Sequence, residues 1–171
     1  MSGAHNALGA NPAAEGAITR PRGFSACGFT AGIKESGLPD LALLVSDRPA
    51  TAAAVYTQNQ STAAPVHISK AHTKNASLRA AVVNSGNANC ATGDQGLADA
   101  REMTRLAASL IGCDAEEVFV NSTGIIGHYL PMDLLRVAIP QLAPTSDGGA
   151  DFTRAIMTTD TFQKEAVATF K

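Results

Sequence analysis

The chain has 171 residues, of which 45% are hydrophobic and 16% charged, and its formal net charge is −2. This length and composition are typical of one folded globular domain and exclude a disordered chain. The 13 lysines and arginines are scattered, which excludes the clustered basic surface of a nucleic acid-binding protein, and no apolar run approaches the roughly 18 to 20 residues that cross a bilayer membrane.

The first 20 residues are rich in Gly, Ala, Asn and Pro without periodicity. We expect them to form a flexible arm ahead of a single domain that spans residues 21–171. They lack the basic and apolar regions of a signal peptide, so the expected compartment is the cytoplasm. In that reducing compartment Cys27, Cys90 and Cys113 should be small buried side chains, and their wide spacings do not indicate a metal site.

The first half of the chain predicts short strands, because its apolar segments are bounded by Gly, Pro, Asp or Asn. These segments are residues 24–30, 40–45 and 52–57, and a fourth strand is expected at residues 78–83. A short helix over residues 65–74 should separate the third strand from the fourth, with Pro65 in its first turn.

The clearest helix follows the fourth strand. Thr92 and Gln95 fit a capping box, apolar residues then recur at helical spacing, and Gly112 ends the run. Beyond it the pattern predicts a strand at 117–120, a helix from Pro131 that Pro140 ends or kinks, a helix over 149–157 and a final strand at 165–170. Strands that alternate with helices indicate an α/β or intimately mixed α+β fold.

Two loops each follow the end of an apolar strand and carry hydroxyls, amides and glycines. They are NSGNANCATG (residues 84–93) and NSTGIIG (residues 121–127). Loops at strand ends are common ligand sites. In the second loop the Thr123 hydroxyl and the Gly124 N–H are candidates for an oxyanion hole, with an ordinary turn as the alternative. The first loop has no phosphate-binding motif, so we expect its amides to satisfy buried backbone groups.

Other reactive side chains lack a marked partner. Cys90 lies on the first loop, but no base stands at a recognisable spacing, which favours an unreactive buried thiol. His128 follows the second loop and can act as an acid or base near neutral pH, or pack beside Tyr129. The remaining histidines are expected at the surface: His5, His67 and His72.

A third polar segment, AIMTTDT (residues 155–161), combines three threonines with Asp160. A threonine nucleophile needs a base to take its proton, and an ionised carboxylate is a weak base for an alcohol. On local chemistry alone the segment is better interpreted as a helix end followed by a capped turn.

Taken together, these segments resemble the ornithine acetyltransferase family, the bifunctional glutamate N-acetyltransferases of arginine biosynthesis. The resemblance runs from about Pro21 to Lys171 and rests on GFTAGIK (28–34), DLALLVSD (40–47), VVNSGNANCATGDQGLADA (82–100), VNSTGIIGHYLPMD (120–133) and AIMTTDTFQKEA (155–166). It implies the layered sheet-and-helix fold of the aminopeptidase and ornithine acetyltransferase type, with this chain as the α chain of a precursor that cleaves itself.

The resemblance implies a ping-pong acyl transfer. In the family, the acetyl group of N-acetylornithine passes to the N-terminal threonine of the β chain and then to glutamate. The base is that threonine's own α-amino group, since such groups have a pKa of about 7.7 to 8.0. The implied partner is the β chain of the same precursor, in a heterotetramer of two α and two β chains. No cofactor or metal is implied, and acetyl-CoA is a further candidate as acetyl donor.

Position by position, the resemblance assigns Thr123 and Gly124 to the oxyanion hole and Thr158 to a substrate contact, while the residues after Thr158 shape the loop. The sequence departs from the family at Gln163, where Pro is common, and at His128 and the residue after it. These changes are expected to alter loop shape more than chemistry. The family's lysine-bearing substrate segment and Ala-Thr cleavage junction are absent, so we expect either an α chain cut short of its usual end or one whose last residues are missing from the sequence.

Two alternatives stand beside the acetyltransferase. One is a relative that uses the same N-terminal nucleophile on another amine or for peptide hydrolysis. The other is a non-catalytic binding domain that keeps the fold. The presence of both STG and MTTD counts against this second alternative, because a site released from catalysis has no reason to keep both.

Overall fold

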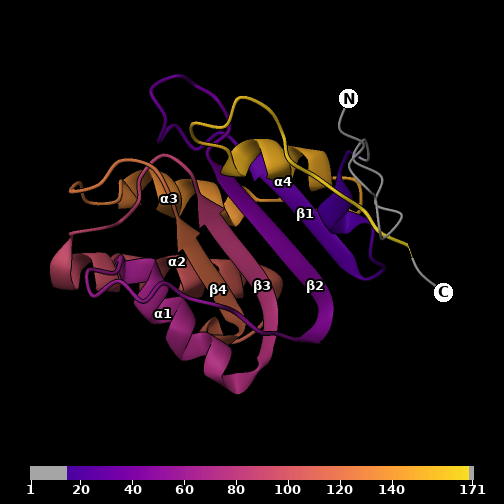
Figure 1. The fold of residues 1–171 in the computed structure, drawn as a ribbon, viewed down its shortest axis with the longest axis horizontal. Helices are drawn as coiled ribbons and strands as arrows, with labels where there is room; N and C mark the ends of the chain where they lie inside the picture. The colour runs from indigo at the N-terminus through magenta and orange to yellow at the C-terminus, as the bar shows by residue number, and fades with distance from the viewer. Residues whose placement is uncertain (1–14, 170–171) are drawn as a thin grey trace, which may run out of the picture.

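The computed structural model describes residues 15–169 and has a mixed α/β fold, as predicted (Figure 1). The strands are β1 (Phe24–Phe29), β2 (Leu41–Thr51), β3 (Ser77–Asn84) and β4 (Val118–Ser122). The helices are α1 (Ala64–His72), α2 (Gly93–Ile111), α3 (Met132–Ala138) and α4 (Gly149–Ile156). Short 3-10 helices lie at Ala17–Thr19, Thr73–Asn75, Ala115–Glu117 and Ile139–Gln141.

The strands form one sheet in the order β1-β2-β3-β4. The pairs β1–β2 and β2–β3 are antiparallel, whereas β3 and β4 are parallel and are joined through α2. The parallel pair ends in register, with Asn84 opposite Ser122. Because the carboxyl ends of parallel strands meet at one edge of a sheet, the loops after β3 and β4 start side by side.

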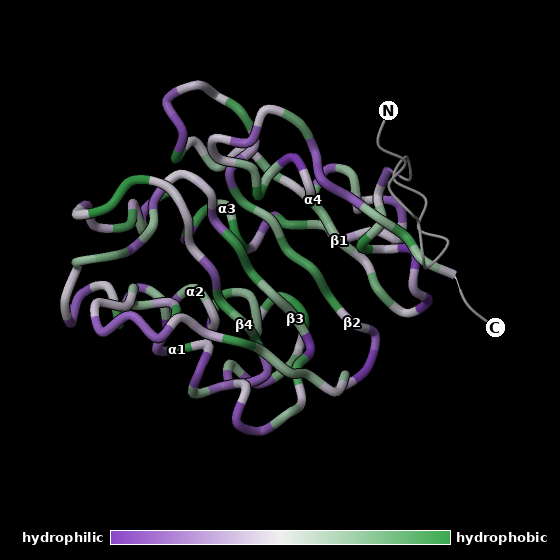
Figure 2. The backbone as a smooth tube through the Cα atoms, in the orientation of Figure 1, coloured by the Kyte–Doolittle hydropathy of each residue, from purple (hydrophilic) through white to green (hydrophobic). Residues whose placement is uncertain are grey.

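Alternate residues of the strands face two different layers of helices. Leu43 and Val82 point into the main core, where they pack with Met103 of α2, and all three side chains are fully buried. Val83 points to the opposite face, where Phe152 of α4 covers it. Figure 1 shows α4 lying against β1 and β2, and Figure 2 shows hydrophobic residues concentrated along the strands. The sheet is therefore the middle layer between two layers of helix.

The ends of α2 follow the prediction only in part. Gly112 ends the helix as predicted, with a left-handed φ of 70°. The predicted capping box is wrong, because Thr92 makes no side-chain bond to the helix and its hydroxyl donates to Asn89 Oδ1 at 2.7 Å instead. Gln95 Nε2 likewise donates to Asp99 one turn along, also at 2.7 Å. The Thr92 side chain is thus bonded to the buried amide of Asn89 and accepts no hydrogen bond from the first N–H groups of the helix.

Prolines mark helix boundaries close to where the sequence places them. Pro65 lies in the first turn of α1, as predicted. Pro140 lies in the 3-10 helix that follows α3, so α3 ends before it. Helix α3 begins at Met132, one residue later than expected, with Pro131 as its N-cap.

The strand predicted at residues 52–57 is wrong. Strand β2 continues to Thr51, which pairs with Ser77, the first residue of β3. Beyond this pair β3 offers no further backbone, so the residues after Ala52 have no strand to bond to. Val55 is accordingly 99% exposed.

The strand predicted at residues 165–170 is also not formed in its described part, 165–169. Glu165 accepts hydrogen bonds from the Thr153 hydroxyl of α4 at 2.5 Å and from the Gly16 N–H at 3.0 Å. These contacts hold the segment against α4, and within residues 165–169 only Val167 forms an isolated β-bridge. Most of the predicted N-terminal arm, residues 1–14, lies outside the described residues, whereas Ile18 packs against the core beneath α4.

Candidate active site

The loops after β3 and β4 continue the pairing of their strands. The Thr123 N–H donates to the Asn84 carbonyl at 3.0 Å, and the Ala88 N–H donates to the Ile125 carbonyl at 2.8 Å. A further bridge between Asn87 and Ile125 extends the parallel pair. The two loops with similar composition are therefore in direct contact, and Thr123 is held by backbone bonds.

Three buried asparagines hold the backbone of the first loop. The fully buried Asn84 accepts hydrogen bonds from the N–H groups of Gly86 (3.3 Å) and Asn87 (3.1 Å) and donates to Ser122 Oγ (2.7 Å). Asn87 donates to the carbonyls of the two residues that follow the second loop, and Asn89 donates to a carbonyl in the first turn of α2. Each bond satisfies a group that burial would leave without a partner. The prediction that these amides support buried backbone is confirmed.

The exit of α4 is fastened to the same place. The Ser85 hydroxyl donates to the carbonyl of Ala155 in the last turn of α4. From the loop between β1 and β2, Lys34 Nζ donates to the carbonyl of Met157, at 2.7 Å. Met157 directly precedes Thr158, so the segment that carries the predicted substrate contact lies beside the two strand-end loops.

These segments border a cavity of about 570 Å³. Its lining residues are Ile33, Lys34, Glu35, Ser36, Ser85, Gly86, Thr123, Gly124, Ile125, Thr158 and Thr159. The three residues that the resemblance assigns to a site, Thr123, Gly124 and Thr158, thus share one cavity. Thr159, which was expected only to shape the loop, also lies in the cavity wall.

Two adjacent lining residues of the cavity carry hydrogen-bond donors. Within residues 15–169, neither the Thr123 hydroxyl nor the Gly124 N–H has a hydrogen-bond partner. No buried side-chain nitrogen or oxygen of the described chain lacks a partner, so the Thr123 hydroxyl is open to the cavity. Two free donors next to each other can stabilise a negative oxygen that develops on a carbonyl under attack.

Comparison with known proteins adds a family to this geometry. Residues 25–171 match the ArgJ family. The chain belongs to the ArgJ family. It is 50% identical over 159 residues to the arginine biosynthesis bifunctional protein ArgJ of Symbiobacterium thermophilum. The matched region covers 90% of this chain and 39% of that protein. The chain therefore spans about two fifths of the length of the curated relatives it matches.

Two crystal structures resemble the ArgJ-family chain closely. The arginine biosynthesis bifunctional protein argJ of Bacillus halodurans gives a TM-score of 0.87 at 39% identity, over 94% of this chain and 85% of that one. The ornithine acetyltransferase of Mycobacterium tuberculosis, complexed with ornithine, gives a TM-score of 0.84 at 40% identity, over 88% of this chain and 83% of that one. The predicted family and fold type are confirmed.

Other candidate residues lie outside the lining of this ArgJ-family cavity. Cys90 is half-buried, and its carbonyl accepts a hydrogen bond from the Gly127 N–H at 2.9 Å. His128 is exposed and contributes its carbonyl, which Asn87 bonds at 3.2 Å. Asp160 is exposed, and a hydrogen bond from Lys164 holds its pKa below the ordinary value, which makes this carboxylate a poorer base.

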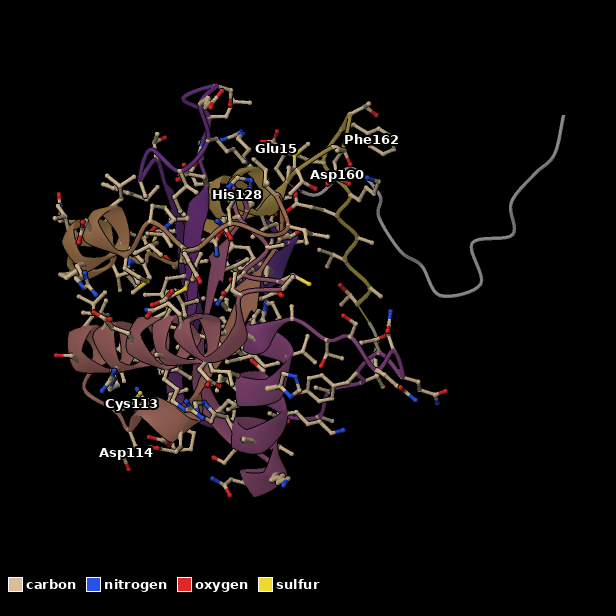
Figure 3. The ribbon with its side chains drawn as sticks, turned by 90° about the vertical axis from the view of Figure 1, so that its left-hand side faces the viewer. Glu15, Cys113, Asp114, His128, Asp160 and Phe162 are labelled. Atoms are coloured by element: carbon tan, nitrogen blue, oxygen red, sulfur yellow. The ribbon has the colours of Figure 1, made fainter. Side chains whose placement is uncertain are left out.

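The remaining cysteines and histidines lie away from the site. Cys27 and Cys113 were expected to be buried, but both are half-buried. Partial burial raises the pKa of both thiols. Figure 3 shows Cys113 at the opposite end of the molecule from His128. His67 is exposed as predicted, but His72 is half-buried and its Nδ1–H donates to a β4 carbonyl at 2.8 Å. His5 lies outside the described residues.

Among the lining residues that carry no role in the sequence analysis are Lys34, Ser85 and Gly86. Each lies in a motif that carries the family resemblance, which is the one signal that the sequence offers for them. The contacts of Lys34 and Ser85 are made with the exit of α4, so local patterns do not reveal them. Gly86 packs so tightly that a Cβ atom there would lie 2.5 Å from Ile33 Cγ2.

Neither a metal centre nor a membrane span is found in the described part of the chain. No three His, Cys, Asp or Glu side chains among residues 15–169 are grouped to hold a metal ion. None of the helices there is both long and apolar enough to cross a membrane.

Proposed function

We propose that this chain is the α part of an acetyltransferase that moves the acetyl group of N-acetylornithine to glutamate. One observation carries the proposal: Thr123, Gly124 and Thr158 line the same cavity, with the Thr123 hydroxyl and Gly124 N–H free of partners within residues 15–169. The names of its relatives, arginine biosynthesis bifunctional protein and ornithine acetyltransferase, support the same reaction.

In this proposal Thr123 and Gly124 form the oxyanion hole. When a nucleophile attacks the acetyl carbonyl, negative charge develops on the oxygen, and two fixed donors stabilise it without having to reorganise. The Thr123 backbone is fixed by its bond to Asn84, whose own side chain is tied to the backbone of the first loop. Thr158 contacts the substrate from the other wall of the cavity.

The nucleophile in this proposal belongs to a second chain. The cavity is rich in hydroxyls, but none of the hydroxyls contributed by the described residues is bonded to a histidine or carboxylate base. Glu35 is the carboxylate in the lining, and it is exposed. An N-terminal threonine on a β chain brings both a hydroxyl and an α-amino base of suitable pKa.

Exposed apolar side chains beside the cavity support such a partner. Leu38, Ile125, Ile126 and Phe162 lie in the segments that form the cavity walls or directly follow them, and each is 62–64% exposed. Apolar groups that gather at one place on a surface mark interaction sites. We propose that the β chain of the same precursor covers them, in a heterotetramer of two α and two β chains that works in the cytoplasm without a cofactor.

Mass spectrometry of the protein purified from cells tests this proposal. The expected result is a second, co-purifying polypeptide that begins with threonine, together with acetyl exchange between N-acetylornithine and labelled glutamate. Absence of both would refute the acetyltransferase and favour a non-catalytic domain. Release of free amino acids from peptides, without exchange, would favour the aminopeptidase alternative. A parallel reaction with labelled acetyl-CoA shows whether it also donates the acetyl group.

A further inference from the structure

Lys34 connects two walls of the cavity through its ammonium group. Lys34 Nζ donates to the Pro39 carbonyl at 2.8 Å and to the Met157 carbonyl at 2.7 Å. Pro39 belongs to the same loop as Lys34, whereas Met157 caps the end of α4, where its N–H bonds to the Arg154 carbonyl at 3.3 Å. The ammonium thus joins the loop after β1 to the residue next to Thr158.

The backbone of Lys34 is itself held in place by a buried carboxylate. Asp40, which is fully buried, accepts hydrogen bonds from the N–H groups of Ala31 (2.7 Å), Ile33 (2.6 Å) and Lys34 (2.9 Å). The carbonyl of Asp40 accepts a bond from the Ser85 N–H at 2.8 Å. Lys34 therefore starts from a fixed point beside the first strand-end loop.

The contacts of the Lys34 ammonium are with carbonyls and not with a carboxylate. Within the described residues Lys34 forms no ion pair, and burial lowers its pKa although the nearby Asp40 raises it. Hydrogen bonds from a charged donor to a carbonyl are stronger than those between neutral groups. Two such bonds offset the desolvation cost of the half-buried ammonium. This is expected of a side chain that links two loops.

We propose that Lys34 is the positioning residue for Thr158, which it holds at the cavity wall through the Met157 carbonyl. This inference rests on the proposed function, in which Thr158 contacts the substrate. Within residues 15–169 the Thr158 backbone has one weak local bond of its own, from its N–H to Asp160 at 3.4 Å. Without Lys34 the segment after α4 can move, while Thr123 and Gly124 stay fixed by the strand-end loops. Substrate binding should therefore suffer more than turnover.

Steady-state kinetics of the complete enzyme, with its β chain, test the proposal. Lys34→Leu removes the donors, Lys34→Arg keeps a charged donor, and Lys70→Leu on α1 removes an exposed lysine as a matched control. We expect Lys34→Leu to raise KM for N-acetylornithine about tenfold with kcat within about threefold of wild type, the size expected for one displaced hydrogen bond. Lys34→Arg should restore most of the affinity, and Lys70→Leu should match wild type. An unchanged KM in Lys34→Leu overturns the proposal.

A double mutant asks whether Lys34 acts through Thr158. If it does, Lys34→Leu should add little to the KM increase already caused by Thr158→Ala, because the contact that it positions is gone. If the two KM increases multiply, Lys34 does not act through Thr158, and the proposal is wrong.

A spectroscopic measurement separates this proposal from the proposed function. The chain has four methionines, so labelled methionine methyl groups give few NMR signals. Lys34→Leu should shift the Met157 signal and leave that of Met103, which is fully buried in the core, unchanged. A shifted Met157 signal in an enzyme without acetyl exchange would refute the proposed function but support the contact between Lys34 and Met157. An unshifted Met157 signal would refute the contact between Lys34 and Met157, whether or not the enzyme is active.

Discussion

A Cβ atom on Gly124 would lie 2.6 Å from the carbonyl carbon of Gly86. The two strand-end loops therefore touch backbone to backbone at the proposed oxyanion hole. Gly124 also has a φ of 127°, a conformation that residues with side chains rarely adopt. The loop motif requires glycine at this position for both reasons.

Gly124→Ala should therefore destabilise the fold more than replacement of a glycine that has a positive φ but free space around an added Cβ. Gly127 in the same loop provides that control, because its φ is 84° but no atom lies within 4 Å of an added Cβ. We expect Gly127→Ala to cost about 1 kcal/mol and Gly124→Ala about 3 kcal/mol of unfolding free energy. Urea denaturation measures both. Equal losses would mean that contact with Gly86 is unimportant.

Replacing Thr123 should affect turnover. Thr123→Ala removes one donor to the developing oxyanion, and we expect kcat to fall about 10²- to 10³-fold, as for other losses of such a donor. Thr123→Ser keeps the hydroxyl and should retain most of the activity. Thr161→Ala, at an exposed position outside the lining, is the control. Acetyl exchange rates provide the measurement, and a change of less than about twofold in Thr123→Ala would remove the assigned role.

The buried amide of Asn84 should matter for stability. Asn84→Ala leaves the N–H groups of Gly86 and Asn87 without their acceptor, and each unsatisfied group costs about 1–3 kcal/mol. We expect a loss of at least about 2 kcal/mol on unfolding in urea. Asn121→Ala is the control, since Asn121 is exposed on the neighbouring strand. Similar denaturation midpoints for the two variants would contradict this account of the loop.

The pH dependence of stability should reveal Asp99. This side chain is 2% exposed, and burial raises its pKa above the ordinary value of 3.8. The folded state then holds its proton more tightly than the unfolded state, so stability falls as pH rises from 3.8 through the raised pKa. Asp99→Asn cannot ionise and should be more stable than wild type at pH 7, by a margin that disappears as pH falls towards 3.8.

Denaturation across this pH range checks the prediction, with Asp147→Asn as the control at an exposed carboxylate. A constant difference between Asp99→Asn and wild type at every pH would show that ionisation of Asp99 is not the cause.

The parts of the fold that local patterns determine are predictable from the sequence. Helix α2 and strand β3 have clear apolar periodicity, and both form where predicted. The failures have tertiary causes. Residues 52–57 have the pattern of a strand, but the residues after Ala52 have no strand to pair with. The Thr92 side chain bonds Asn89 instead of capping α2.

The site follows the same division. The family resemblance assigns site roles to Thr123, Gly124 and Thr158 from their positions in the motifs. The structure brings these three residues to one cavity. Local chemistry alone left Thr123 and Gly124 between an oxyanion hole and a turn. The role of Lys34 could not be predicted from the sequence, because its partner Met157 is far away along the chain. No local pattern shows which segment packs beside the Lys34 ammonium.

The bond between Lys34 and Met157 joins residues 123 positions apart. Closing so long a loop costs chain entropy, which is recovered only once the intervening strands and helices have packed. Folding should therefore build the sheet first and the cavity last. Refolding followed by backbone circular dichroism will then run ahead of refolding followed by ligand binding, and a chain released before α4 has docked will be largely folded yet unable to bind.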